Sequence, residues 1–363
     1  MEVSRRMKIL MLSNLISYTY NFRKEIIEAF AHRGHEVVVV CDIDDASKCR
    51  ELGEICKVID VPFHGKGTNP MEELKLIRTY STIMKREIPD IVFSFTIKMN
   101  LYGGLVAKRL RIPYVPMITG LGELEKGGKL KSILMFLHKR VMPGAKCVVF
   151  QNEDNRDYFK RNGIGFKESV IVPGSGINLG KFVMKPYPPR DKVVFSFLGR
   201  FIEAKGILEF LQCAERMACD EISFIAAGTM DEKFKGYVDE LVSNGKLVYE
   251  GELGDTRDFL AKTSCLVLPT YHPEGLSNVI LEACATGRPV ICTPRTGCKE
   301  IVEDGVNGFF CNAKDVENLI EIMKRFRSLL YEERKRMGEA GRRIVEGKFD
   351  RNLVVGQYLS LLE

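Results

Sequence analysis

The sequence of 363 residues predicts an α/β protein built from two doubly wound domains, each with a parallel sheet. Three observations support this prediction. The chain is too long for one ordinary core and suits two domains of about 150 to 190 residues. Short apolar runs alternate with helical stretches in both halves. A proline-rich segment at 186–190 (PYPPR) divides the halves and is typical of a stiff linker.

The first half begins with a strand, a helix and a second strand. We expect strands at 7–12 and 36–41, a loop at 13–20, and a helix from about Asn21 to Arg33 that ends at Gly34. This spacing predicts a right-handed β-α-β unit. Later strands are expected near 58–61, 91–95, 114–118 and 147–151. We assign 1–180 to the first domain. Its ligand should lie beyond the strand ends, at the loops 13–20, 96–100 and 119–123.

The second half starts afresh with an apolar strand at 193–200. Further strands are expected at 221–227, 246–249, 265–269, 290–293 and 308–311, and closing helices at about 315–326, 331–346 and 353–362. We assign 190–350 to the second domain, and 351–363 to a C-terminal helix expected to pack back on the first domain. Two similar Rossmann-like halves imply that the domains face a cleft.

Composition narrows the class of protein. Apolar residues make up 45% and charged residues 28%, as in soluble globular proteins. The net charge is +6, and our count places about +8 of it in residues 1–180, which points to an anionic surface near the first half. Basic and aromatic residues do not interleave as in nucleic-acid modules, so we expect no nucleic-acid partner. The sequence has no apolar run of about 18 residues and no signal-peptide cleavage site. Eleven cysteines without a C-x-x-C pair are typical of reduced thiols in a cytoplasmic protein.

The segment 274–282 (EGLSNVILE) is the strongest candidate for ligand binding. It follows an apolar strand and opens a helix that Gly287 terminates, and Ser277 is a good N-cap. The free amides of Leu276, Ser277 and Asn278, with the positive end of the helix dipole, would face a diphosphate.

Carboxylates stand at both ends of this segment. Glu274 lies just outside the predicted helix and Glu282 lies inside it, one turn beyond Asn278. The two side chains would hold separate hydroxyl pairs of one long ligand. The alternative is a surface helix whose acids face water.

A second group of residues follows the first strand of the second domain. Gly199 and Arg200 come at the strand end, and Lys205 follows five residues later, before Gly206. Arginine offers a planar fork to phosphate oxygens and lysine a compact charge. Both are suited to meeting the charge that grows on a departing diphosphate.

Together, the E-x7-E and R-x4-K spacings resemble family-four glycosyltransferases, which are retaining enzymes of the GT-B fold. The resemblance implies that Glu274 contacts the donor sugar, Glu282 the ribose, and Arg200 and Lys205 the diphosphate of a UDP-sugar. It makes Glu274, Arg200 and Lys205 the candidate catalytic residues. Further donor contacts are expected at Gly199, Gly251, Leu253, Gly275, Leu276, Ser277 and Asn278.

The first domain resembles a bacterial subgroup that adds sugars to polyprenyl-diphosphate-linked acceptors, including an N-acetylgalactosaminyltransferase of N-glycan assembly. The candidate acceptor residues are Tyr20, Arg23, Lys98, Asn100, Gly120 and Gly122. The implied function is transfer of a sugar to a lipid-linked saccharide in the synthesis of a cell-surface polysaccharide or glycan. One departure is that the first loop has no glycine, whereas many family members have a pair there. None of the five histidines is nominated as catalytic.

Two further segments bear on metal binding and on membrane binding. Asp42 and Asp44 form a D-x-D string, but it lies far in sequence from the nucleotide motifs, so we expect no metal and no other cofactor. The basic, amphipathic stretch 126–142 is typical of a helix lying on anionic lipid, and equally of a helix packed on the sheet. We therefore expect a cytoplasmic protein that binds peripherally to the inner face of the cell membrane.

Other functions remain as alternatives. A UDP-sugar 2-epimerase shares the two-domain fold, and a non-catalytic sugar-nucleotide-binding subunit needs the same pocket. The paired cations and carboxylates disfavour both. The glycines at 174–176 and 120–122 lack the third glycine of a dinucleotide fingerprint, so an NAD-dependent enzyme is disfavoured.

Overall fold

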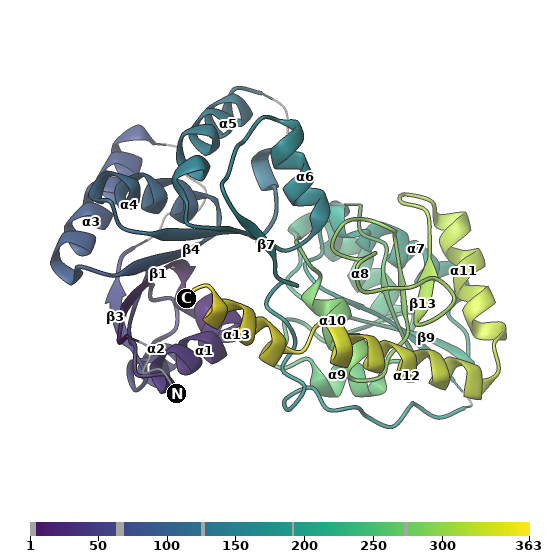
Figure 1. Ribbon diagram of the computed structural model, residues 1–363. Helices are drawn as coiled ribbons and strands as arrows, with labels where there is room; N and C mark the ends of the chain where they lie inside the picture. The colour runs from purple at the N-terminus through teal and green to yellow at the C-terminus, as the bar shows by residue number, and fades with distance from the viewer. Residues whose placement is uncertain (1–4, 63–68, 125–127, 191, 272–274) are drawn as a thin grey trace. The chain divides into compact units, whose positions relative to one another are not determined.

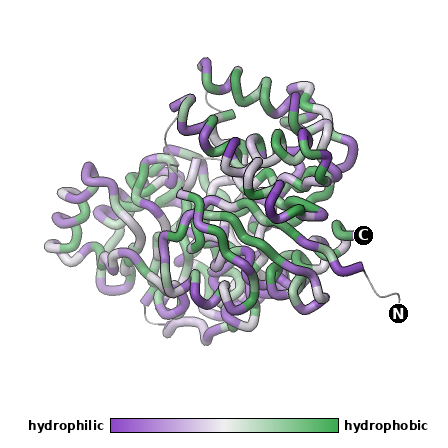
Figure 2. Tube along the Cα trace, turned by 90° about the vertical axis from the view of Figure 1, so that its left-hand side faces the viewer, coloured by the Kyte–Doolittle hydropathy of each residue, from purple (hydrophilic) through white to green (hydrophobic). Residues whose placement is uncertain are grey.

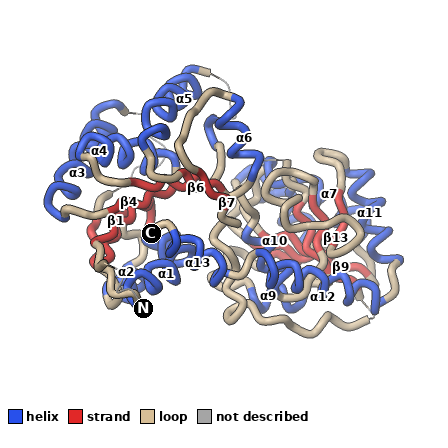
Figure 3. Tube along the Cα trace, viewed as in Figure 1, coloured by secondary structure: helices blue, strands red, loops and turns tan. Residues whose placement is uncertain are grey.

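The computed structural model describes residues 5–62, 69–124, 128–190, 192–271 and 275–363. The chain divides into two compact units, one of residues Met1–Ser175 with Val354–Glu363 and one of residues Gly176–Leu353. Each unit contains one sheet of parallel strands set among helices (Figure 1; Figure 3). This architecture confirms the predicted fold class of two doubly wound domains.

Unit 1 has a seven-stranded sheet with the order β3-β2-β1-β4-β5-β6-β7. Its strands are β1 (Lys8–Leu15), β2 (Glu36–Asp42), β3 (Lys57–Asp60), β4 (Ile91–Phe95), β5 (Tyr114–Ile118), β6 (Val148–Phe150) and β7 (Ser169–Ile171). Its helices are α1 (Ile16–His32), α2 (Ala46–Gly53), α3 (Pro70–Glu87), α4 (Gly104–Leu110), α5 (Lys129–Val141), α6 (Glu153–Arg161) and α13 (Arg351–Ser360). Short helical turns complete it: η1 (Met99–Gly103), η2 (Gly122–Leu124) and η3 (Met142–Gly144). The sequence pattern did not predict β7, whose residues are only partly buried.

The expected loop at 13–20 is wrong. Strand β1 continues to Leu15 and α1 begins directly at Ile16. The carboxylate of Asp44, two residues beyond the end of β2, accepts a hydrogen bond of 3.0 Å from the Ser17 amide and another from the Ser17 hydroxyl. Because this cap comes from a residue far along the chain, no local signal marks the helix start at Ile16.

The core of unit 1 lies on both faces of the sheet. Strand β4 is buried along its whole length, as expected of a central parallel strand. Val354 and Tyr358 of α13 belong to the hydrophobic cluster that covers one face, and the Tyr358 ring lies 5.8 Å from that of Phe93. Figure 1 shows α13 beside α1. The C-terminal helix therefore closes a core formed mainly by residues more than 170 positions earlier.

Unit 2 has a six-stranded sheet with the order β10-β9-β8-β11-β12-β13. Its strands are β8 (Val193–Leu198), β9 (Ile222–Ala227), β10 (Val248–Tyr249), β11 (Cys265–Leu268), β12 (Val290–Cys292) and β13 (Gly308–Phe310). Its helices are α7 (Ile207–Met217), α8 (Glu232–Ser243), α9 (Arg257–Lys262), α10 (Asn278–Ala285), α11 (Val316–Ser328) and α12 (Tyr331–Lys348), with one short turn, η4 (Glu203–Lys205).

The strands of unit 2 form one continuous hydrophobic core with the inner faces of its helices. Figure 2 shows hydrophobic residues gathered in interior segments and many hydrophilic residues on the outer turns of the helices. In unit 2 the sheet order makes β8 the neighbour of both β9 and β11. The loops that follow these three strands therefore emerge side by side at one edge of the sheet.

Candidate functional site

The turn that carries Lys205 is attached to the end of a neighbouring strand. The carbonyl oxygen of Ala204 accepts hydrogen bonds from the Thr270 hydroxyl and the Tyr271 amide, both at 3.0 Å. Gly206 has φ +76°, and a β-carbon there would lie 2.3 Å from the Pro269 carbonyl oxygen. Only glycine allows this close approach. These contacts fix Lys205 beside the end of β11, which leads toward α10.

Lys205 is a partly desolvated cation. Burial lowers the pKa of its ammonium group to about 8, with a smaller contribution in the same direction from Arg200. The thiol of Cys298 acts in the opposite direction. Arg200 itself is exposed. The structure therefore brings the two cations of the R-x4-K spacing to the same loop cluster.

Glycines also allow the loops after β8 and β9 to approach each other closely. Gly228 follows β9 with φ +135°, and a β-carbon on it would lie 2.0 Å from the Gly199 carbonyl oxygen. The Gly228 amide donates a hydrogen bond of 2.7 Å to the carbonyl oxygen of Gly251. Gly199 and Gly251 thus lie at adjacent strand ends, joined through Gly228, which the sequence pattern marks only as a glycine after an apolar strand.

The start of α10 differs from expectation in one detail. Ser277 occupies the N-cap position, but its side chain makes no capping hydrogen bond. Its amide donates to the Gly297 carbonyl oxygen at 2.9 Å. The expectation that the Ser277 amide is free for a diphosphate is therefore wrong in this structure, because the loop after β12 already binds it. Gly275 and Leu276 are buried, and Asn278 is half-buried at the first helical position. Glu274 lies outside the described residues.

Glu282 is a half-buried carboxyl group one turn into α10. It accepts a hydrogen bond of 2.7 Å from the Thr256 hydroxyl. Desolvation raises its pKa to about 7, while Thr256 and the positive charges of Lys181 and Arg351 oppose the shift. No motif marks Thr256, although it follows Gly251 and Leu253 in one loop. This loop and α10 therefore share a polar edge.

The candidate acceptor residues of unit 1 have different environments. Lys98 forms an ion pair of 2.7 Å with Glu73, and both side chains are partly exposed. Asn100 is buried, accepting from the Ser94 hydroxyl at 2.8 Å and donating to the Met117 carbonyl oxygen at 2.7 Å. Asn100 thus joins β4 to β5 and does not present its amide to solvent.

Arg23 and Tyr20 come from α1. The Arg23 guanidinium is buried, lies 4.6 Å from the centre of the Phe95 ring and donates to the Ser175 hydroxyl. The Tyr20 hydroxyl donates to Glu51. Gly120 and Gly122 both have positive φ, at 159° and 49°, in the turn after β5. Thr96, directly after β4, is a non-glycine residue with φ +73°, a strained conformation that sequence patterns do not reveal.

Comparisons with known proteins agree with this fold. The family model described as glycosyl transferase 4-like matches residues 8–152, and the model described as glycosyl transferases group 1 matches residues 192–328. These two segments cover most of the chain, one in each unit. The chain belongs to the GT-B glycosyltransferases.

The chain is similar over its full length to a curated bacterial enzyme. It is 28% identical to the N,N'-diacetylbacillosaminyl-diphospho-undecaprenol alpha-1,3-N-acetylgalactosaminyltransferase of Campylobacter jejuni, with 98% of each chain covered. It is 24% identical to the UDP-Gal:alpha-D-GlcNAc-diphosphoundecaprenol alpha-1,3-galactosyltransferase of Escherichia coli, covering 76% of this chain and 78% of that one. A crystal structure of Anabaena HepE in complex with UDP and glucose has the same fold, with a TM-score of 0.79 at 19% identity over 98% of this chain and 99% of that one.

Proposed function

We propose that unit 2 binds a UDP-sugar, with Arg200 and Lys205 at the diphosphate, Glu282 at the ribose and Glu274 at the sugar. One observation carries this proposal: the Lys205 turn is hydrogen-bonded to the end of β11, the strand that leads to α10. The loop after β8 supplies a cation, and α10 supplies its N-terminus and a half-buried carboxyl group, so two neighbouring segments offer contacts to the diphosphate and the ribose of a nucleotide.

The positive charge of Lys205 is suited to stabilising a negatively charged leaving group. Partial desolvation strengthens its interaction with an anion, because fewer waters compete for the ammonium group. Arg200 adds a planar fork that is always protonated. These two cations meet the charge on the departing diphosphate in the proposal, so that no metal or other cofactor is required.

The proposed reaction transfers the sugar with retention of configuration. The acceptor hydroxyl attacks the anomeric carbon from the face that the diphosphate leaves, the bond to the diphosphate oxygen breaks, and the diphosphate takes the hydroxyl proton. Atoms and charges balance without a further reactant. Membership of the GT-B glycosyltransferases and the family-four motifs support this pathway.

The proposed acceptor is a saccharide linked to a polyprenyl diphosphate, bound by unit 1, in the synthesis of a surface polysaccharide or glycan. The similar enzymes from Campylobacter jejuni and Escherichia coli are both named for a sugar joined to undecaprenol through a diphosphate. The positive charge of the first half supports an anionic acceptor. Tyr20, Arg23, Lys98 and the turn at 120–122 remain the candidate contacts, whereas Asn100 acts by holding that turn's strand in place.

A lipid-linked acceptor also requires contact with a membrane surface, and α5 is the proposed contact. Among the described residues, no helix is both long enough and apolar enough to cross a bilayer. Helix α5 exposes Ile133 and Phe136, which are 56% and 57% accessible, between the exposed cations Lys129 and Lys139. Apolar side chains flanked by lysines suit peripheral attachment to anionic lipid on the cytoplasmic side of the cell membrane.

UDP release by the purified protein tests the proposed function. Wild type is mixed with a panel of UDP-sugars and detergent-dispersed polyprenyl-diphosphate saccharides, with and without a metal chelator. We expect turnover of one sugar that survives chelation and is lost in Glu274→Gln and Lys205→Gln. Lys235→Gln, which removes an exposed lysine of α8, is the matched control.

Three results would argue against parts of this proposal. Turnover that stops with the chelator contradicts metal independence, and turnover of GDP-sugars alone contradicts the uridine donor. Conversion of the sugar without UDP release favours an epimerase. For the membrane contact, Ile133→Ser and Phe136→Ser should reduce co-sedimentation with anionic vesicles, whereas Leu208→Ser, at an exposed apolar position in unit 2, should not.

A further inference from the structure

Unit 2 contains a polar cavity at the edge of the sheet where the strands begin. The cavity measures about 680 Å³. Val193 and Ile222, the first residues of β8 and β9, line it, whereas Arg200 lies two residues beyond the last residue of β8. A six-residue strand spans about 20 Å. The cavity is therefore separate from the proposed donor site and lies at the opposite edge of the same sheet.

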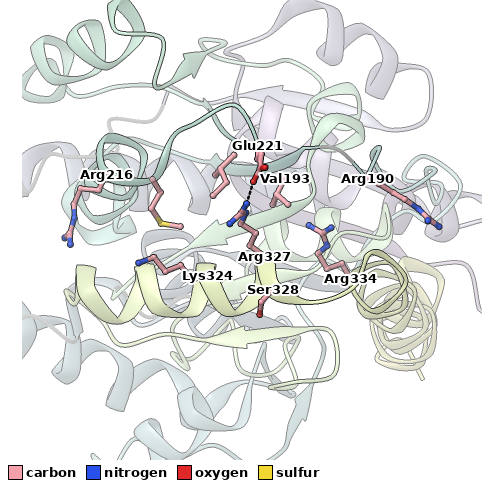
Figure 4. A pocket seen from close by; sticks show the side chains of 10 residues that line it. Arg190, Val193, Arg216, Glu221, Lys324, Arg327, Ser328 and Arg334 are labelled. Carbon is pink, nitrogen blue, oxygen red and sulfur yellow. Dashed lines mark hydrogen bonds and ion pairs between the residues drawn. The ribbon is translucent and has the colours of Figure 1, made fainter.

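The lining of this cavity is strongly basic. Five cationic side chains and one carboxylate contribute to it: Arg190, Arg216, Lys324, Arg327, Arg334 and Glu221. Figure 4 shows Arg327 and Arg334 extending into the same space, with Arg216 and Arg190 toward its two ends. The residues come from the linker, the end of α7, the end of α11 and the start of α12. Their assembly is a property of the tertiary fold.

Three of these arginines already have carboxylate partners. Arg216 binds Glu317 at 2.9 Å, Arg190 binds Glu332 at 2.8 Å, and Arg327 binds Glu221. Lys324 and Arg334 have no carboxylate within ion-pair distance in the part of the chain that the structure describes. The five cations therefore have three direct carboxylate partners among the described residues, and the excess of two positive charges is close in size to the charge of one phosphate monoester near neutral pH.

Helix termini explain only part of this charge. Helices α7 and α11 both end at the cavity, and Arg216 and Arg327, in their last turns, complement the negative ends of the helix dipoles. Arg334 lies in the first turn of α12, where the helix dipole disfavours a cation. The dipole therefore gives no reason for an arginine at this position.

Arg334 is also buried. Its side chain is 8% exposed, and its Nε has no hydrogen-bond partner among the described residues. A guanidinium removed from water without a counter-ion is costly. An anion bound in the cavity would supply both the missing acceptor and the missing charge.

We propose that this cavity is a binding site for a phosphate monoester group, held by the guanidinium of Arg334 and the ammonium of Lys324, with Arg327 exchanging its bond to Glu221 for one to the phosphate. The arginine fork matches the spacing of phosphate oxygens. Val193, Met217 and Ile222 provide an apolar wall for the organic part of the ligand. The site is independent of the donor and acceptor sites proposed above.

Calorimetric titration of the full chain with glycerol 3-phosphate tests this site. Lys324→Gln, an exposed change with no ion pair to lose among the described residues, should weaken binding about ten-fold, as expected for a lost charged hydrogen bond. Arg334→Gln should abolish binding. Lys235→Gln is the matched control for net charge, and Lys205→Gln removes phosphate binding at the donor site. Both should leave this titration at wild-type affinity.

Vesicles containing phosphatidic acid provide the second arm, because that lipid carries the same monoester group. Co-sedimentation that depends on Lys324 and Arg334, without glycerol 3-phosphate binding, assigns the site to a lipid headgroup and supports the proposal. Absence of binding to both ligands overturns it. Binding that is lost in Lys205→Gln and unchanged in Lys324→Gln overturns it as well, because the phosphate then occupies only the donor site. If Arg334→Gln does not fold, Lys324→Gln still decides the outcome.

Discussion

Replacing Glu282 with glutamine should stabilise the protein in a pH-dependent way. Burial raises the folded-state pKa of Glu282 to about 7, above its ordinary value of 4.5. Between these pH values the folded state binds more protons than the unfolded state, so the free energy of unfolding falls as pH rises from 4.5 to 7. A shift of this size lowers the free energy of unfolding by at most about 3 kcal/mol. We expect a change of about 1 to 3 kcal/mol because the side chain is only half-buried.

Glutamine keeps the oxygen that accepts from Thr256 and removes the titration. At pH 8 the variant should therefore be more stable than wild type by about 1 to 3 kcal/mol, and at pH 4.5 the two should agree. Native-state hydrogen exchange of α10 reports this difference locally and does not require two-state unfolding of both units. The exposed Glu321→Gln on α11 is the control for the loss of a surface carboxylate.

Two outcomes would refute the electrostatic reasoning. A Glu282→Gln variant less stable than wild type at pH 8 would mean that Lys181 and Arg351 outweigh the burial of the carboxylate. An equal gain at pH 4.5 and pH 8 would mean that packing, not charge, causes the change. If Glu282 binds the ribose as proposed, the same variant should gain stability and lose donor affinity, an exchange of function for stability.

Two further predictions concern the Lys205 turn. Gly206→Ala should lower the melting temperature and abolish UDP release. The added β-carbon meets the Pro269 carbonyl oxygen at 2.3 Å, and the backbone strain adds about 1–3 kcal/mol. The control Gly236→Ala, in the open middle of α8, should instead stabilise the protein by about 0.5–1 kcal/mol. The pKa of Lys205 near 8 predicts that kcat/KM for the donor falls as pH rises through about 8. Lys205→Arg should remove most of this fall, because arginine stays protonated there. An unchanged fall in Lys205→Arg would mean that another group titrates.

Local patterns in the sequence predicted most of the strands. Parallel strands covered on both faces are nearly continuous apolar runs, so segments such as 36–41 and 193–198 are recognisable without a structure. The partly buried β7 lacks such a run and was not predicted. The family-four motifs likewise depend only on residue identity and spacing, and the family models confirm the class that they indicated.

Contacts between distant residues were not predictable. The start of α1 depends on Asp44, and the amide of Ser277 is occupied by the Gly297 carbonyl oxygen. Asn100 was expected to face the acceptor, but two strands bury it and satisfy its amide. In each case the partner lies on another element, so propensity and spacing carry no information about it.

The sequence by itself determined the two doubly wound domains and the glycosyltransferase class, and its motifs are the basis on which donor-binding loops are proposed. Only the tertiary structure decided which of those loops touch, how far Lys205 and Glu282 are desolvated, and that a basic cavity forms around Arg334 at the opposite edge of the sheet. The physical reason is that apolar periodicity and motif spacing are local properties of the chain, whereas desolvation, charge pairing and cavity lining depend on which strands and helices become neighbours.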